Sequence, residues 1–284
     1  MKEKNVHWFP GHMKRAFNEI EPRLKAIDVV IEIVDARAPI SSKNPFLERI
    51  TQNKKRIIVF SKFDMVESKN LIPFIEFYKK KGYETVCFNN KSKDCLENLK
   101  KAIFKLGNDK REKEIKRGMK PQNIRIMVLG IPNVGKSSLI NALVGRNSAS
   151  KANKPGHTRA QQWIRLDLGF DLLDTPGILP PHYDDKQIAI NLALIGSIPD
   201  EILPISFLSE ELLNLLLNNY ENELCNRFKI EKPLISHQDV IEKIAISRGL
   251  LLKEGKLDID STEKLLLKEF KEGKIVKAIV DKIC

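Results

Sequence analysis

The sequence of 284 residues is 42% hydrophobic and 30% charged, which is typical of a globular protein and excludes wholesale disorder or a collagen-like repeat. No apolar run approaches the roughly 20 residues of a spanning helix, no signal peptide is recognisable, and four scattered cysteines indicate reduced thiols. The net charge of +12 resides in residues 1–120, which hold 28 Lys and Arg against 16 Asp and Glu.

Strand and helix patterns alternate over the first 180 residues. Apolar residues at spacings of three and four predict an amphipathic helix over residues 12–27. Short apolar runs predict buried strands at 29–34, 57–60, 84–88 and 124–129. Further helices are expected at 70–81, 96–106 and 136–144. Charged residues 107–123 predict a linker or surface loop, residues 145–161 a loop, and residues 164–173 a hairpin that turns at Gly169.

After Pro181 the strand patterns stop. Helical patterns cover residues 185–198, 200–228, 237–249 and 261–281. Since strands alternating with helices favour a mainly parallel sheet, we predict an α/β domain over residues 1–182 with helices on both faces of the sheet. A smaller all-α domain is expected over residues 183–284.

The concentration of positive charge favours a polyanionic partner, most simply a nucleic acid. A lysine-rich solvated surface is the plainer alternative, because Lys79–Lys81 and residues 110–120 resemble ordinary helix ends and linkers. Composition does not distinguish RNA, DNA and an anionic membrane.

The most specific motif is Gly130–Ser137, which matches G-x-x-x-x-G-K-[ST] between a predicted strand and a predicted helix, as in a phosphate-binding P-loop. Backbone N–H groups of such a loop cradle phosphates, its lysine neutralises them, and its hydroxyl binds Mg²⁺. The residues expected to contact nucleotide here are Pro132, Asn133, Val134, Gly135, Lys136, Ser137 and Ser138.

Two downstream segments complete a phosphate and metal site. Asp174-Thr175-Pro176-Gly177 follows a predicted strand, where Asp174 would hold Mg²⁺ through water and the Gly177 amide would sense the γ-phosphate. Thr158 lies in the intervening loop, where a threonine can bind Mg²⁺ and switch with the γ-phosphate. The metal ligands predicted are therefore Ser137, Thr158 and Asp174, with a plain loop residue as the alternative for Thr158.

A base-reading motif is predicted at Ser61-Lys62-Phe63-Asp64, after the second strand. The Asp64 carboxylate can accept hydrogen bonds from guanine N1–H and N2–H, and the stem of Lys62 can cover the base. Asn89, Asn90 and Lys91 follow the third strand and suggest a second loop that contacts the base. This motif precedes the P-loop, whereas most GTPases have the opposite order, so a circular permutation is indicated.

The chain resembles the circularly permuted GTPases, and most closely the bacterial ribosome biogenesis GTPase A family. The resemblance spans nearly the whole chain. Its residues are Trp8–Met13, Asp35–Pro39, Gly130–Ser138, Pro155-Gly156 with Thr158, Gln161–Trp163, Asp174–Ile178, Arg248-Gly249, and Phe270 with Gly273-Lys274.

The resemblance implies a cytoplasmic GTPase that binds GTP or GDP with Mg²⁺ and assists late assembly of the large ribosomal subunit, slowly when alone and faster on the particle. It implies that the C-terminal helices contact rRNA, although residues 204–284 carry one acidic residue more than they carry basic ones. Ribosomal proteins are further candidate partners, no membrane is involved, and a monomer is expected.

Two features depart from common GTPase patterns. The family usually has Asn where this chain has Ser61, so we expect weaker guanine-nucleotide affinity with specificity kept by Asp64. The position after Gly177 is Ile178, which cannot orient water as glutamine does. Asn133 matches a position that helps to hold K⁺ in cation-dependent relatives, where the ion would stabilise transition-state charge. The predicted catalytic residues are His12, Asn133 and Lys136.

Plainer roles remain open for some of these residues. His12 can orient water, cap a helix or contact RNA. Trp8 and Phe9 can stack on RNA bases or pack the N-terminal helix, and Arg37 can contact RNA or pair with Asp35. For the whole protein, the alternatives to an assembly GTPase are a nucleotide-gated RNA-binding scaffold with incidental hydrolysis and a P-loop kinase or ATPase, the last disfavoured by Asp64.

Overall fold

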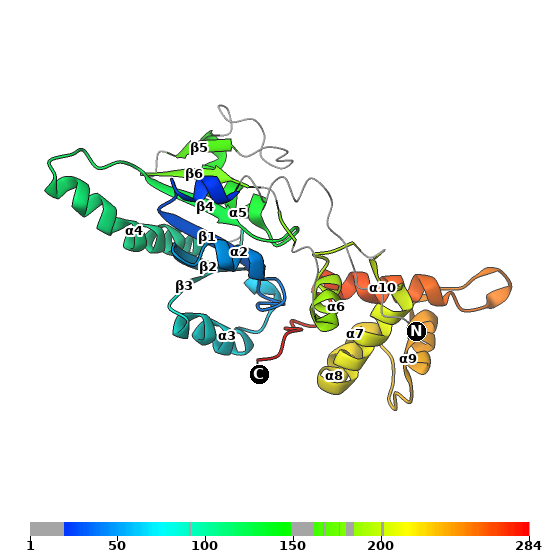
Figure 1. The fold of residues 1–284 in the computed structure, drawn as a ribbon. Coiled ribbons are helices and arrows are strands. Elements are labelled where there is room, and N and C mark those ends of the chain that lie inside the picture. The colour runs from blue at the N-terminus through cyan, green and yellow to red at the C-terminus, as the bar shows by residue number, and fades with distance from the viewer. Residues whose placement is uncertain are drawn as a thin grey trace. The chain divides into compact units, whose positions relative to one another are not determined.

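The computed structural model describes residues 20–90, 92–148, 162–166, 169–175, 177–179, 185–199 and 202–283. The chain divides into two compact units, one of Met1–Asp184 with Asp281–Cys284 and the other of Asp185–Val280. The strands of the sheet belong to the first unit, whereas the second is built from helices (Figure 1).

A six-stranded sheet in the order β3-β2-β1-β4-β6-β5 forms the frame of the first unit. The strands are β1 Val29–Asp35, β2 Lys55–Ser61, β3 Glu84–Phe88, β4 Ile124–Leu129, β5 Gln162–Leu166 and β6 Phe170–Asp174. Neighbours pair in parallel except β5, which forms an antiparallel hairpin with β6. The hairpin turns at Gly169, whose φ of 83° favours glycine. The predicted strands, the hairpin and the mainly parallel sheet are confirmed.

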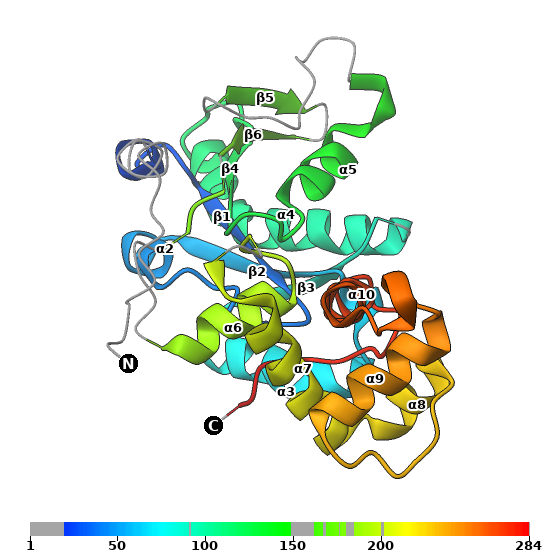
Figure 2. The same cartoon turned by 90° about the vertical axis from the view of Figure 1, so that its right-hand side faces the viewer.

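Helices cover both faces of this sheet. Those of the first unit are α2 Pro45–Ile50, α3 Ser68–Lys80, α4 Lys93–Lys116 and α5 Lys136–Ser148. In Figure 2, α4 and α5 lie on one side of the sheet and α2 on the other. Residues 20–24 are helical, and the predicted apolar stripe is buried there at Ile20, Leu24 and Ile27. These three side chains pack with Leu47, Met127 and Leu173 in one core cluster.

Helix α2 is absent from the sequence prediction, although its start carries a recognisable signal. The Asn44 side-chain oxygen accepts hydrogen bonds from the backbone N–H groups of Phe46 and Leu47. Pro45 occupies the first helical turn, where its missing N–H costs nothing. An Asn-Pro pair after a strand thus starts this short helix, and Thr51 ends it.

The predicted linker over residues 107–123 is wrong, because α4 continues without a break to Lys116. Gly107 does not end the helix but is buried within it. A Cβ at this position would come within 2.3 Å of Ile124 Cδ1. The glycine is therefore a site of close packing between α4 and β4, beyond which the helix runs past the strands (Figure 1).

The second unit contains α6 Lys186–Leu194, α7 Ile205–Asn219, α8 Glu221–Phe228, α9 His237–Arg248 and α10 Ile259–Lys271. The helix predicted over 200–228 is in fact two helices that meet at Tyr220, and the one predicted over 261–281 ends at Lys271. Arg227 donates two hydrogen bonds of 2.8 Å to Glu269, which joins α8 to α10. Among the described helices of both units, none combines the length and apolar character needed to cross a membrane.

Candidate nucleotide site

The P-loop joins the end of β4 to the start of α5. Gly130 has φ 154°, and a Cβ there would lie 2.8 Å from the Ile33 carbonyl oxygen, so only glycine fits. Gly135 and Asn133 also have positive φ values, of 100° and 60°. Turns with such backbone angles form concavities of N–H groups that bind anions. The loop therefore has the local conformation that a phosphate-binding segment requires.

Lys136 lies between the P-loop and the segment after β6. Its side chain is 9% exposed, and its Nζ donates a 2.6 Å hydrogen bond to the Ile131 carbonyl. A Cβ at Gly177 would come within 2.7 Å of Lys136 Nζ, so the missing side chain at 177 makes room for the lysine. The Ile178 N–H also donates to the Gly130 carbonyl at 3.2 Å, which ties the two segments together.

The other predicted P-loop residues surround this lysine. Val134 is buried, whereas Asn133 and Ser137 are exposed, and Pro132 and Ser138 are half-buried. Ser137 is in the first turn of α5, so its hydroxyl is accessible to a metal ion or a phosphate. The predicted phosphate contacts thus come together in one loop and one helix start.

Ser61, the last residue of β2, reaches the P-loop directly. Its Oγ lies 2.5 Å from the Val134 carbonyl oxygen and 3.0 Å from the Val34 carbonyl oxygen. Because a serine hydroxyl has one proton, it donates to one of these acceptors at a time, and Val134 is the closer. The short side chain therefore braces the P-loop.

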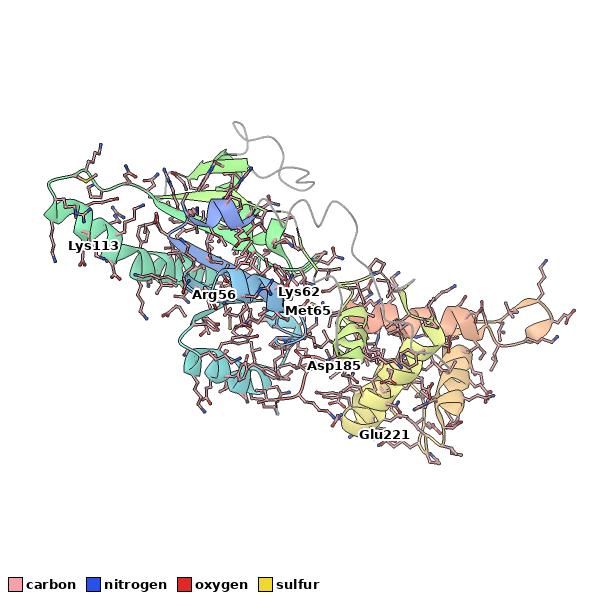
Figure 3. All side chains as sticks on the ribbon, in the orientation of Figure 1. Arg56, Lys62, Met65, Lys113, Asp185 and Glu221 are labelled. Atoms are coloured by element: carbon pink, nitrogen blue, oxygen red, sulfur yellow. The ribbon has the colours of Figure 1, made fainter. Side chains whose placement is uncertain are left out.

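Lys62, labelled in Figure 3, follows Ser61 and contacts both the P-loop and the end of β1. Its Nζ donates to the Asn133 carbonyl at 2.9 Å and to the Asp35 carboxylate at 2.8 Å. Asp64 follows in a short 3-10 turn, Phe63–Met65, and is half-buried. Ser61 and Lys62 of the predicted base-reading motif therefore contact the P-loop, at the carboxyl ends of β2 and β4.

Asp35 is a buried anchor at the end of β1 and is not among the predicted site residues. Its carboxylate accepts hydrogen bonds from the Arg37 backbone N–H, the Arg37 guanidinium and Lys62. Burial favours the neutral acid, but the two cations outweigh it and hold the pKa of Asp35 below its ordinary value. Arg37 is 4% exposed, so the pairing with Asp35 is the alternative observed for it.

Asn44 connects this region to the segment after β6. While its oxygen caps α2, its Nδ2 donates a 2.9 Å hydrogen bond to the Ile178 carbonyl. Asn44 is not among the predicted site residues, although an Asn-Pro pair after Asp35–Pro39 is a visible signal. In the second predicted base-contact loop, Asn89 Oδ1 accepts from the Ser92 N–H at 2.8 Å, and Asn90 is exposed.

Four of the predicted site residues lie wholly or partly outside the part of the chain that the structure describes. His12, Lys91 and Thr158 lie outside the described residues, and for Asp174 only the backbone, at the end of β6, is described. The described residues hold no cluster of three or more His, Cys, Asp or Glu that could bind a metal ion by itself. Mg²⁺ at phosphate sites takes few protein ligands and keeps phosphate oxygens and waters, so the exposed Ser137 hydroxyl fits that chemistry.

Comparison with known proteins gives a consistent result. Residues 125–229 match the family model described as 50S ribosome-binding GTPase. The chain is 37% identical to Ribosome biogenesis GTPase A of Bacillus cereus, over 96% of this chain and 92% of that protein. It is 30% identical to Ribosome biogenesis GTPase A of Thermotoga maritima, over 95% and 91%. GNP-bound YlqF from T. maritima has a similar fold, with a TM-score of 0.64 and 26% identity over 95% of this chain and 100% of that one.

Proposed function

The chain belongs to the ribosome biogenesis GTPase A family, and on this premise we propose that it binds and hydrolyses GTP to control its association with the maturing large ribosomal subunit. One observation carries the proposal: three loops meet at the carboxyl edge of the sheet. Contacts of Ser61 with Val134, Lys62 with Asn133 and Ile178 with Gly130 hold the base-reading, phosphate and γ-phosphate-sensing segments together.

The phosphates are assigned to the P-loop and its lysine. Lys136 exchanges its bond to the Ile131 carbonyl for the β- and γ-phosphate oxygens, and the Gly177 amide senses the γ-phosphate. Ser137, Thr158 and Asp174 would hold Mg²⁺, which neutralises charge between the β- and γ-phosphates when bound. Asp64 selects guanine through its N1–H and N2–H groups, with Lys62, Asn89, Asn90 and Lys91 around the base.

Hydrolysis is assigned to groups other than the residue after Gly177. Ile178 is 1% exposed and apolar, so it neither orients nor activates water. His12 is proposed to orient the attacking water, and Asn133, exposed in the P-loop, to help hold a K⁺ ion that would supply positive charge in the transition state. We expect slow turnover alone and faster turnover on the ribosomal particle.

The two parts of the chain are proposed to have different functions. Residues 1–182 bind and hydrolyse the nucleotide, and residues 183–284 bind rRNA and ribosomal proteins of the large-subunit precursor. The protein is proposed to act as a monomer in the cytoplasm. Its nucleotide state would be transmitted directly from the loop after β6 to the helices that follow it in the chain.

The test is GTP turnover in K⁺ buffer with and without purified large ribosomal subunits. We expect a rise of at least roughly tenfold with the particle, which corresponds to about 1.4 kcal/mol of transition-state stabilisation.

The same assay in Na⁺ tests the role of K⁺, because turnover should be slower in Na⁺. The variant His12→Ala tests the water-orienting role, since it should bind GTP normally but lose the stimulation by the particle. Unchanged turnover with intact particle binding would support the scaffold alternative instead.

A further inference from the structure

The C-terminal part of α4 is a strongly basic projection from the first unit. Residues 110–120 contain six Lys and Arg against two Glu. All of them lie beyond Gly107, the point of closest packing between α4 and β4. Figure 3 shows Lys113 on this part of the helix, where it runs past the strands. Part of the excess positive charge of residues 1–120 therefore lies on this one segment, residues 110–120.

A cavity of about 470 Å³ lies at the base of this projection. It is lined by α4 and by Asp28 and Lys55, which stand at the amino ends of β1 and β2. Lys110 and Lys113 of α4 line it together with Arg117, the C-cap of the helix, because spacings of three and four place them on one face. The cavity is therefore at the edge of the sheet opposite the nucleotide site.

The cations around this cavity fall into two groups. Lys55 pairs with Asp109, and Lys110 pairs with Asp28 at 2.9 Å. Lys113 and Arg117 have neither an ion pair nor a hydrogen bond through their side chains within the described part of the chain. Lys113 is in the last turn of α4 and Arg117 is its C-cap, where the helix dipole favours cations but does not neutralise them as an ion pair would. The unpaired charge at the cavity is therefore available for an anionic partner.

We propose that the α4 basic face, defined as Lys110, Lys113 and Lys116 of α4 together with Arg117 and Lys120 just after it, binds the phosphate backbone of double-stranded RNA in the large-subunit precursor. Lys113 and Arg117 are four residues apart, which is about 6 Å of helix rise, so both can reach phosphates of the same strand. Lysine and arginine side chains that protrude from a helix reach backbone phosphates without reading bases. The inference rests on the proposed function, and it places an RNA contact on the GTPase unit itself.

The experiment measures binding of the full chain to an RNA duplex of about 20 base pairs, a length that covers a typical double-stranded RNA contact. The test variant is Lys113→Glu/Arg117→Glu. The matched control is Lys79→Glu/Lys80→Glu, which reverses two exposed lysines at the C-terminal end of α3 in the same unit. GTP binding is measured for each variant and shows that the fold is intact.

We expect the test variant to bind the duplex at least roughly tenfold more weakly, with a salt-dependence slope that is smaller by about two, while the control stays near wild type. Equal losses in both variants, or no loss in the test variant, would overturn the proposal. Sedimentation with large ribosomal subunits distinguishes failure of the RNA-binding proposal from failure of the proposed function. If the wild-type protein binds the duplex but no particle, the proposed function is wrong and the RNA contact of the α4 basic face still holds. If the test variant loses the particle but keeps the duplex, the α4 basic face binds protein and the RNA proposal is wrong.

Discussion

The two ends of the sheet in the first unit use positive charge in opposite ways. At the carboxyl end, Arg37 and Lys62 pair with the buried Asp35, and Lys136 bonds to the Ile131 carbonyl. At the amino end, Lys113 and Arg117 project from α4 without such partners among the described residues. Cations with internal acceptors fix the loops of a small-ligand site, whereas cations without them remain free for a large external partner.

At the carboxyl end of the sheet, the variant with the largest expected effect is Asp35→Asn. This change leaves the buried Arg37 and the ammonium of Lys62 without their carboxylate. Removing one partner of a buried ion pair typically costs about 3–5 kcal/mol, so we expect a loss of that size in the free energy of unfolding. Denaturant titration measures it. A loss below about 1 kcal/mol, the range of surface pairs, would show that Asp35 is not an anchor.

The same residue predicts a pH dependence. The pKa of Asp35 is lower in the folded protein than its ordinary value of 3.8. Its contribution to stability is therefore complete above pH 3.8 and is lost as the pH falls below that value towards the folded pKa. In Asp35→Asn, this part of the acid destabilisation should be absent from stability measured between pH 5 and pH 3. An unchanged acid profile in the variant would assign the effect to other carboxylates.

At the amino end, the corresponding test is Gly107→Ala. A Cβ would lie within 3.0 Å of three side-chain atoms of the buried Ile124, which has little room to move. Overpacking of this kind costs about 1–3 kcal/mol, against a gain of roughly 1 kcal/mol from helix propensity. We expect net destabilisation in denaturant titration, and a smaller cost of Gly107→Ala when the same change is made in an Ile124→Ala background. Greater stability in the single variant would show that α4 is not held close to β4 here.

This glycine also shows where sequence patterns succeed and fail. The strands at 84–88 and 124–129 were predicted to the residue, because apolar runs bounded by turn residues depend only on local composition. The end of α4 was missed, because a glycine in a charged segment normally signals a loop, and here its role is set by Ile124, a distant residue in the sequence. Tertiary contact, which no local pattern contains, overrode the local signal.

The nucleotide site likewise contains some residues that local sequence predicts and others that it does not. The P-loop could be predicted from Gly130–Ser137, since its spacing alone specifies the chemistry. The pairing of Arg37 with Asp35 was one of the predicted alternatives, but the contact of Asp35 with Lys62 and the link from Asn44 to Ile178 could not be predicted. Both depend on which strands are neighbours, because β1 lies between β2 and β4 in the sheet.

The smallest expected effect concerns Ser61, where a single hydrogen bond at the carboxyl end of the sheet is tested. Ser61→Ala removes the donor to the Val134 carbonyl and leaves that buried oxygen without this bond. The loss is worth about 1 kcal/mol, so GTP affinity should fall roughly fivefold. Titration with GTP and ATP measures both affinity and specificity.

Ser61→Asn is the informative partner of that variant. Gly135 is a neighbour of Ser61, since a Cβ built on the glycine would be 3.5 Å from Ser61 Cβ, and the glycine has no side chain to oppose a longer residue at 61. If serine only braces the P-loop, asparagine should keep the brace and add a contact to the base, which raises GTP affinity above wild type. Preference for GTP over ATP should persist in all three proteins, because it depends on Asp64. Equal GTP and ATP affinities in wild type would remove Asp64 as the base-reading residue, whatever Ser61 contributes.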